Sequence, residues 1–339
     1  LKGITMRKFG QEIIKAVAGK RIHGILAVPG GVHKTFTKEE REYFLDGINI
    51  ENIDTMISWA QAIIDFIKDY HEKNRKFMDE FAAFPSGHLG MVNEKGGMEL
   101  YHGRLRAIDS EGNITLNDIP TDLYEDYFAE AIERWSYMKF PYLKSIGREK
   151  GWNRVGPLAR MNVCNFIPTP LAEKARQDFI EFTGKKVNNS TLYSHWARLI
   201  EILHCAEEIK MLLHDDEIMG DDLVRNGIPR FKGIGIIEAP RGTLTHRYEV
   251  DEKGMITRCN LIVSTTNNND ALNTAVRWVV NNVINRKGTV TDSMLNQVEV
   301  AIRAYDPCLS CATHAMGKMP LKVEVYDHEG GLMYEKCKN

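Results

Sequence analysis

Two long segments repeat apolar residues at the spacing of an α-helix, and they constrain the fold more than any other feature. The first runs from about Asn52 to Phe84 and the second from about Ser190 to Leu213. In both, apolar side chains recur every three to four residues, which places them along one face of a helix. Helices of this length usually pack against one another, so the pattern predicts a core built as a bundle of long helices.

Shorter segments predict further helices and three β-hairpins. The helical patterns lie at residues 4–19, 37–47, 121–134, 170–183, 270–285 and 290–303. The second of them begins with Thr37 and Glu40 in a capping-box pattern. The hairpin patterns place an acidic, glycine-containing turn between alternating strands, in LRAIDSEGNITL, HRYEVDEKGMITRCNLIV and LKVEVYDHEGGLMYEK. The stretch RIHGILAVPGGVHK is predicted as a loop. The predicted class is mainly α with small antiparallel β-hairpins at the periphery, an α+β fold.

The composition excludes several classes of protein. Of 339 residues, 43% are hydrophobic and 27% charged, which is typical of a globular chain. The formal net charge of −2 offers no basic excess for a nucleic acid or an acidic membrane surface. No apolar run approaches the roughly 18–20 residues of a membrane span. Six cysteines are too few for a disulfide scaffold in a chain of this length.

The segment DPCLSCATH, Asp306 to His314, carries the most specific chemistry. Cys308 and Cys311 present both sulfurs to one point, and thiolates bind zinc, nickel, copper and iron. His314 could supply a third ligand. A zinc ribbon needs a second cysteine pair, which the sequence lacks, and a thioredoxin-like pair opens a helix after a strand. The residues alone favour a metal site, with a redox disulfide and structural thiols as the alternatives.

Arg241 lies in a second informative segment, GIGIIEAPRGTLTH. Pro240 and Gly242 flank this arginine and specify a tight turn, so the guanidinium is a fixed cation. It suits an anionic or electron-rich ligand or a proton-handling site, and a loop arginine paired with a carboxylate is the alternative. The segment VGPLARMN leads to Arg160 and is more typical of a structural arginine. LIVSTTNNND ends a strand in hydroxyls and amides, which suit ligand binding or a helix N-cap.

Taken together, these segments resemble those of a known family. EAPRGTLTH, STTNNND and IRAYDPCLSCATH, with GPLAR and WSYMKFPYLKSIG, resemble the large, catalytic subunit of nickel–iron hydrogenases over the whole chain. The motifs DPCLSCATH and EAPRGTL look most like those of the cytoplasmic, cofactor-coupled group of this family. Within that group they are nearest the methyl-viologen-reducing type that works with heterodisulfide reductase. Deazaflavin-reducing and NAD-reducing types are near alternatives. The resemblance implies an oxidoreductase that splits dihydrogen reversibly and passes electrons to an iron–sulfur small subunit.

The same resemblance implies the metal ligands. Cys308 corresponds to a terminal nickel ligand, and Cys311 to a thiolate that bridges nickel and iron. In this family the iron carries carbon monoxide and cyanide. His314 corresponds to the histidine of a magnesium site.

The residues around the metals are also implied. Arg241 corresponds to the arginine suspended over the metals, and Pro240 lies beside it in the pocket for the diatomic ligands. Thr265 corresponds to the residue that hydrogen-bonds a cyanide, with Thr266 as the alternative. Asp306 corresponds to an acidic residue near the arginine. Arg241, Asp306 and Cys308 are therefore the expected catalytic residues.

The sequence departs from the family pattern at both ends. An N-terminal RxCGxC motif, which provides the family's other cysteine pair, and a proton-passing glutamate are absent. The expectation is an N-terminally truncated fragment, with a separate polypeptide as the alternative. A maturation protease normally cuts family members just after the histidine. Residues 1–314 are thus expected to be the C-terminal portion of the large subunit, a single domain, and residues 315–339 an extension removed on maturation, or else retained in a variant that escapes cleavage.

Two other classes of protein compete with a hydrogenase. A metal-free hydrogenase-like subunit of a respiratory complex is one, but that class has lost the cysteines that Cys308 and Cys311 represent here. A zinc-binding or thiol redox module is the other, and it leaves the Arg241 turn and the Thr265 region unexplained.

Overall fold

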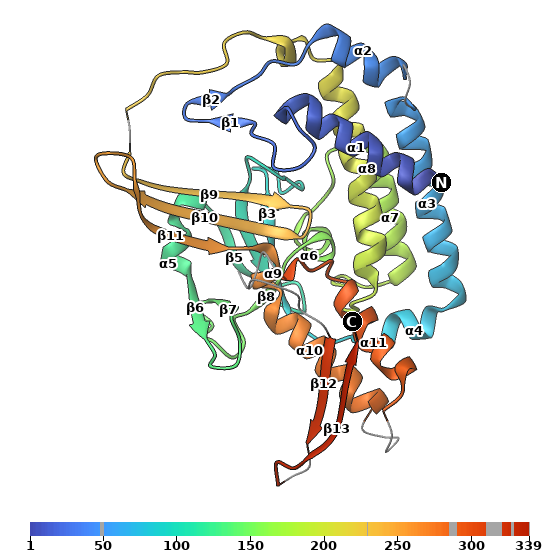
Figure 1. Ribbon diagram of the computed structural model, residues 1–339. Helices are drawn as coiled ribbons and strands as arrows, with labels where there is room; N and C mark the ends of the chain where they lie inside the picture. Colours follow the sequence, from blue (N-terminus) through green and yellow to red (C-terminus); the bar gives the residue numbers. More distant parts are fainter. Residues whose placement is uncertain (48–50, 229, 285–289, 310–320, 327–328, 339) are drawn as a thin grey trace.

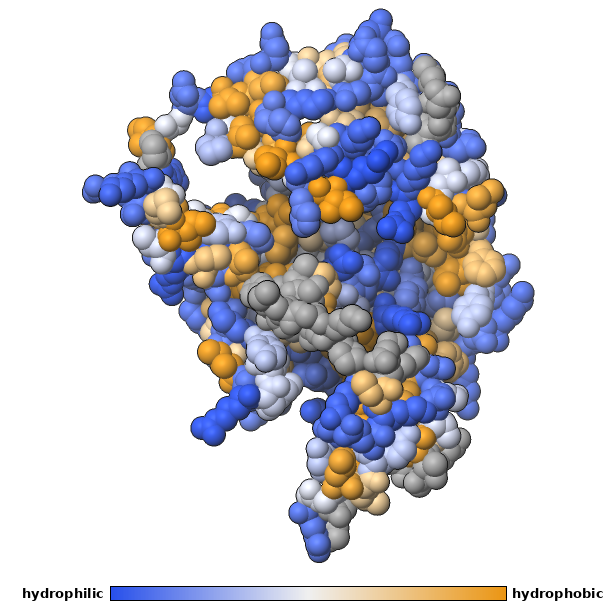
Figure 2. Space-filling model, in the orientation of Figure 1, coloured by the Kyte–Doolittle hydropathy of each residue, from blue (hydrophilic) through white to orange (hydrophobic). Residues whose placement is uncertain are grey.

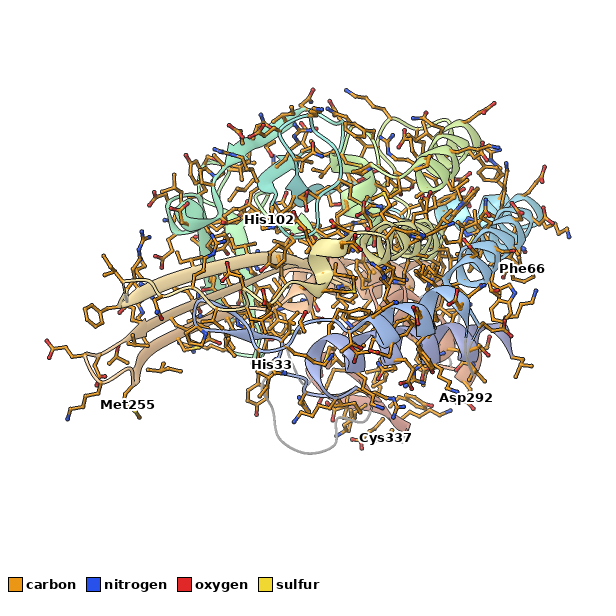
Figure 3. The ribbon with its side chains drawn as sticks, turned by 90° about the horizontal axis from the view of Figure 1, so that it is seen from above. His33, Phe66, His102, Met255, Asp292 and Cys337 are labelled. Atoms are coloured by element: carbon orange, nitrogen blue, oxygen red, sulfur yellow. The ribbon has the colours of Figure 1, made fainter. Side chains whose placement is uncertain are left out.

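The computed structural model describes residues 1–47, 51–228, 230–284, 290–309, 321–326 and 329–338. Helices form one side of the molecule and β-sheets the other (Figure 1). Seen from above, Met255 in the β-hairpin side and Phe66 in the helical side lie at opposite ends (Figure 3). Among the described residues, no helix is both long and apolar enough to cross a membrane.

The helical side is organised around α8 (Tyr193–Leu213), which contacts α2, α3, α6 and α7. Its Trp196, Ala197 and Ile200 are fully buried, as the helical period of this segment predicts. The other helices and helical turns on this side are α1 (Lys2–Ala18), α2 (Lys38–Asp46), α3 (Ile53–Lys73), α4 (Arg75–Glu80), α6 (Pro157–Val163), α7 (Pro170–Thr183) and η2 (Asp216–Met219). Figure 2 shows a mostly hydrophilic face, with hydrophobic side chains gathered at its right edge over α3.

The ends of these helices follow from their capping residues. The Thr37 hydroxyl accepts a hydrogen bond from the Glu40 amide at 3.1 Å, and the Glu40 carboxylate accepts one from the Thr37 amide at 3.0 Å. This confirms the capping box of α2. The helix predicted at about 52–84 is confirmed over most of its length, but it is interrupted at Asn74 and ends at Glu80. α3 stops at Lys73 because Asn74 leaves the helical conformation, with φ −118°, before α4 restarts the chain.

One sheet lies in the interior of the molecule, not at its periphery as expected. Its strand order is β5 (Ile114–Ile119), β4 (Arg104–Ile108), β3 (Gly87–Val92) and β8 (Asn153–Arg154), and β3 pairs with β8 in parallel. β3 is buried from its second residue to its last. Gly90 allows α6 to lie close against it, since a Cβ there would come 3.3 Å from Cγ of Arg160. α6 therefore connects the sheet to α8.

A second sheet is made of β9 (Lys232–Ala239), β10 (Gly242–Val250) and β11 (Ile256–Ile262), in the order β11-β10-β9. The hairpins predicted at β4–β5 and β10–β11 are confirmed by antiparallel pairing. Apolar residues of both sheets form a core of their own, including Leu89, Leu105 and Ile236.

The segment predicted as a helix at 121–134 is helical only in its first half and contains a strand in its second. A short turn η1 (Thr121–Leu123) and α5 (Tyr124–Tyr127) are followed by β6 (Phe128–Ile132), which pairs with β7 (Lys139–Leu143). In residues 128–132, pairing with the next strand of the chain has outweighed the local helical pattern.

The predicted loop at RIHGILAVPGGVHK also contains strands, β1 (Ala27–Val28) and β2 (Gly31–Val32). Gly30 and Gly31 are required there because a Cβ on either would meet the backbone of residues 223–225 at 2.3 Å or less.

The C-terminal part follows β11. It comprises α9 (Ser264–Asn267), α10 (Asn269–Val279), a π-helical turn η3 (Val280–Ile284), α11 (Asp292–Arg303), β12 (Leu321–Tyr326) and β13 (Leu332–Lys338). β12 pairs with β13, which confirms the third predicted hairpin, and Figure 1 shows this hairpin extending away from the body.

Candidate metal centre

Arg241 stands in the turn between β9 and β10. Ala239 pairs with Gly242, so Pro240 and Arg241 are the two connecting residues. Proline fixes its own φ near −65°, and Gly242 completes the turn with φ 128°, a value that residues with a side chain rarely adopt. A Cβ on Gly242 would also come 2.3 Å from Val155 Cγ2. The sequence around Arg241 therefore permits one tightly packed backbone path.

Arg241 contacts Asp306, which is 65 residues further along the chain. The arginine Nε donates a hydrogen bond to the Asp306 carbonyl oxygen and lies 3.4 Å from its Oδ2. Asp306 has φ 50°, so the backbone bends sharply two residues before Cys308. The side chains of Arg241 and Asp306 are 39% and 46% exposed. This ion pair joins the turn to the C-terminal segment and leaves part of the guanidinium open.

The short helix α9 joins the same two segments. Thr265 Oγ1 accepts a hydrogen bond from the Cys308 amide at 3.1 Å. Ser264 donates to the Gly242 carbonyl at 2.6 Å, and Asn267 donates to the Thr243 carbonyl at 3.0 Å. Thr265 and Thr266 are both almost fully buried, and it is Thr265 that contacts Cys308. α9 thus holds the Arg241 turn on one side and Cys308 on the other.

Arg160 forms a buried ion cluster beneath the turn. Its Nε and Nη2 donate to the two carboxylate oxygens of Glu201 at 2.6 and 2.7 Å, and its Nη1 donates to Glu238 at 2.7 Å. Burial raises the pKa of Glu238, against the opposing effect of Arg160. Burial by itself lowers the pKa of the Arg160 guanidinium. The two carboxylates that face it raise the pKa by more, so the net shift is upward.

Sequence reasoning missed the two acidic members of this cluster. Glu238 is the first residue of the EAPRG segment, and its position one strand residue before the turn was the available signal. Glu201 lies on the buried side of α8, which also contains His204 and Glu207, so no signal in the sequence singles it out.

A cavity of about 440 Å³ opens beside the cluster. One wall is charged, from Arg160, Arg198, Glu201, Glu238 and Asp306, and the opposite wall is apolar, from residues of α1 and α3. Arg198 donates to the Ala304 carbonyl at the end of α11 at 2.9 Å. The cavity therefore reaches from the helical side to the Asp306 segment.

The structure brings together the described residues that the sequence singled out. Pro240, Arg241, Thr265, Asp306 and Cys308 meet where the β9–β10 turn, α9 and the segment after α11 converge. Thr266 is the neighbour of Thr265 on α9. Cys311 and His314 lie outside the described residues. Within the described part of the chain, no three His, Cys, Asp or Glu side chains group as a metal site, so Cys308 is the one expected metal ligand that the structure places.

The remaining cysteines differ from Cys308. Cys164 is buried at the end of α6 and its pKa is raised to about 11 by burial, so it is a protonated thiol at neutral pH. Cys205 is exposed on α8 and lines the cavity described above. Cys259 and Cys337 lie exposed on strands. The residues available at the candidate centre, a backbone-anchored cysteine beside a fixed cation, fit a soft metal held by thiolates.

Comparisons with known proteins identify the family. The family model of nickel-dependent hydrogenase matches residues 90–314. The chain is 48% identical to the beta subunit of the NAD-reducing hydrogenase HoxS from Cupriavidus necator, over 99% of this chain and 69% of the relative. It is 38% identical to a chain of the F420-non-reducing hydrogenase vhc from Methanococcus voltae, over 97% of this chain and 69% of the relative.

Solved structures agree with these relatives. The crystal structure of an NAD+-reducing nickel–iron hydrogenase in its H2-reduced state matches with a TM-score of 0.88 and 45% identity, over 92% of this chain and 68% of that chain. The nickel–iron–selenium hydrogenase of Dm. baculatum, at 19% identity and a TM-score of 0.69 over 92% of this chain and 68% of that chain, shares the fold. The chain belongs to the nickel-dependent hydrogenase family.

Family membership confirms the expectation of a hydrogenase large subunit, an oxidoreductase acting on dihydrogen. It also implies a nickel–iron centre. The fold is a mixture of helices and strands that matches this family, less dominated by helices than expected. The NAD-reducing and F420-non-reducing types are both among the relatives, and the NAD-reducing relative has the higher identity.

Proposed function

We propose that this chain is the catalytic large subunit of a nickel–iron hydrogenase that splits dihydrogen reversibly into protons and electrons. The proposal rests on one observation: the β9–β10 turn, α9 and the segment that contains Cys308 meet at one place. The contacts that join them are Thr265–Cys308 and Arg241–Asp306. Helix α8 and the helices around it would correspond to the long-helix bundle of the family.

Cys308 is proposed as a terminal nickel ligand and Cys311 as the thiolate bridging nickel and iron. When bound, the centre, whose iron carries carbon monoxide and cyanide in this proposal, would supply the redox chemistry. Thr265 accepts a hydrogen bond from the Cys308 amide and so helps to fix the backbone that carries the sulfur. The second cysteine pair that the family uses would come from an RxCGxC motif that is not in this sequence. His314 is proposed as a ligand of a magnesium ion.

Arg241 is proposed to supply a fixed positive field over the open position where dihydrogen reacts. Its turn is locked by Pro240 and Gly242, and Asp306 orients its guanidinium. A cation that is already in place costs no reorganisation at the moment of reaction, which is the basis of electrostatic catalysis. The Cys308 sulfur, as a thiolate next to this cation, is the proposed acceptor of the proton that the reaction releases.

The partners follow from the same proposal. Electrons would leave through an iron–sulfur small subunit, and from there to heterodisulfide reductase or a cofactor-reducing module, in the cytoplasm. A maturation protease would cut after His314 and remove residues 315–339, which include the β12–β13 hairpin. The residues of this hairpin provide none of the described contacts to Arg241 or Cys308.

Elemental analysis and infrared spectroscopy test this function. The sample is the full-length large subunit, carrying the upstream cysteines, produced with working maturation proteins and purified with its small subunit. We expect one nickel per complex, infrared bands from iron-bound carbon monoxide and cyanide, and a mass that ends at His314. Absence of nickel and of those bands would refute the function. One zinc instead would favour the thiol module, and no metal at all would favour the metal-free relative.

A further inference from the structure

Arg160 lies directly beneath the turn that carries Arg241, and we propose that it is the residue that positions Arg241 over the reaction site. This inference rests on the proposed role of Arg241. It assigns a function to the GPLAR segment, which the sequence alone left as structural.

The backbone of the turn is bonded to the Arg160 side chain. Nη1 of Arg160 donates to the Ala239 carbonyl at 3.0 Å, and Nη2 donates to the Pro240 carbonyl at 3.3 Å. These are the two residues immediately before Arg241. The side chain of Arg160 is 2% exposed, so the donor side of both hydrogen bonds is shielded from water. The position of Arg241 therefore depends on the position of Arg160.

Three elements in turn fix Arg160. Its own backbone lies on α6 against Gly90 of β3, the carboxylate of Glu201 comes from α8, and that of Glu238 comes from β9. The second oxygen of Glu238 accepts a hydrogen bond from the Thr243 hydroxyl at 2.7 Å. Thr243 lies on β10 and pairs with Glu238 on β9. The ion cluster therefore contacts both strands of the hairpin next to the turn.

The charges of this cluster argue against a role in stability alone. One buried guanidinium faces two buried carboxylates, and burial raises the pKa of one of them, Glu238. Removing charges from water costs several kcal/mol per ion, and apolar residues of equal volume are often as stable or more so. What an ion cluster supplies better than apolar packing is a fixed geometry. The geometry fixed here is that of the Ala239–Pro240 backbone.

Lysine cannot reproduce these contacts. The planar guanidinium meets Glu201 with two parallel hydrogen bonds and still reaches Glu238 and both carbonyls. An ammonium is a point charge that cannot span the same set of acceptors. In Arg160→Lys the turn should loosen, and a displacement of about 1 Å at a reacting centre can lower the rate about 100-fold.

The test uses the matured complex with Arg160→Lys, and Glu201→Gln as a milder second variant that keeps the guanidinium but weakens its anchor. Arg176→Lys is the matched control, because Arg176 is also a buried arginine bonded to a carbonyl, that of Cys164, and to Glu173. Three quantities are measured: nickel content, kcat for dihydrogen oxidation, and hydrogen–deuterium exchange of the backbone amides of Ala239 and residues 241–243.

We expect nickel content near that of the wild type, kcat lowered about 10- to 100-fold in Arg160→Lys and less in Glu201→Gln, and faster amide exchange in the turn for both. Arg176→Lys should change none of these. Unchanged turn exchange in both Arg160→Lys and Glu201→Gln overturns the inference, whatever their activity. So does a nickel-loaded Arg160→Lys enzyme with wild-type kcat while Arg241→Lys is slow.

A double variant separates this inference from the proposed function. If Arg160 acts through Arg241, the Arg160→Lys, Arg241→Lys enzyme should be no slower than Arg241→Lys alone. Losses that multiply would show that Arg160 acts by another route and would overturn the inference. If Arg241→Lys keeps the wild-type kcat with nickel bound, the proposed role of Arg241 fails instead, and turn exchange alone then decides whether Arg160 holds the turn.

Discussion

The Cys308 amide donates a hydrogen bond to Thr265 Oγ1 at 3.1 Å, across 43 residues of sequence. This contact links α9 to the candidate metal ligand, and it is independent of any bound metal. The same short helix is bonded through Ser264 to Gly242, the residue after Arg241. Two segments that lie far apart in the chain are therefore held to each other through one turn of helix.

Replacing Thr265 by valine should weaken metal retention. Valine keeps the shape of threonine but removes the acceptor of the Cys308 amide, and a hydrogen bond lost at a buried site costs about 1–3 kcal/mol. We expect less nickel per complex and a lower free energy of unfolding. Thr266→Val is the matched control, since Thr266 is equally buried but is not the acceptor of this bond. Equal losses in the two variants would disprove a special role for Thr265.

Replacing Gly242 by alanine should displace the Arg241 turn. The new methyl group would come 2.3 Å from Val155 Cγ2 and 2.6 Å from the Gly156 nitrogen, at a φ of 128° that alanine avoids. Strain of this kind costs about 1–3 kcal/mol. The thermal unfolding temperature and the rate of dihydrogen oxidation should both fall. Gly235→Ala, on the same hairpin with open space at its Cβ, should behave like the wild type. A stable, fully active Gly242→Ala enzyme would show that the turn tolerates movement.

His71 should make the protein less stable in mild acid. Its ring packs against Tyr193 and Trp196 at 4.8 and 5.3 Å, and neither ring nitrogen has a hydrogen-bond partner among the described residues. Burial lowers the pKa of His71 to about 4. Between about pH 6.5 and 4, His71 is therefore protonated in the unfolded chain but neutral in the folded chain. Stability is fully present above this window and falls as the pH drops through it.

The His71→Phe variant tests that sign. Phenylalanine fits the aromatic surroundings and cannot titrate, so the variant should lose about 2 kcal/mol less unfolding free energy than the wild type between pH 7.5 and 5. Denaturant unfolding at the two pH values measures the difference. His88, whose pKa burial lowers to about 3, contributes in the same direction and stays in both proteins. Identical losses would show that His71 is not held neutral.

Cys164 should resist alkylation in the folded protein. It is 4% exposed, and burial raises its pKa to about 11, so almost no thiolate is present at pH 8. Mass spectrometry after iodoacetamide treatment should find Cys164 unmodified and the exposed Cys259 modified. In urea both should react. Rapid labelling of folded Cys164 would contradict its assignment as a structural thiol.

Local patterns in the sequence correctly predicted the helices and turns that are determined by residues close together in the chain. The helical period located α8, the Thr37–Glu40 pair located the start of α2, and turn residues located the β10–β11 hairpin. The second half of the segment 121–134 was predicted wrongly because β6 is stabilised by pairing with β7. The buried position of β3 depends on packing against α6, which comes some 65 residues later in the chain.

The residues of the candidate site were also predictable only where a short segment of the sequence is unusual by itself. Arg241 and Cys308 stand in segments whose composition is unusual, so the sequence alone singled them out. Glu201 stands in an ordinary helical stretch, and its importance follows only from the side chain of Arg160 reaching α8. A contact between two distant elements leaves no trace in either segment read alone, whereas a proline, a glycine or a cysteine pair does.

The most direct test of the account is the nickel content of Cys308→Ala compared with Cys164→Ala, each as the full-length large subunit matured with its small subunit. Both variants remove one thiol, but only Cys308 is bonded to Thr265 and lies two residues after Asp306, the partner of Arg241. The account predicts about one nickel per complex in Cys164→Ala and almost none in Cys308→Ala. Equal nickel in the two proteins would contradict the assignment of Cys308 as a metal ligand, and with it the proposed centre.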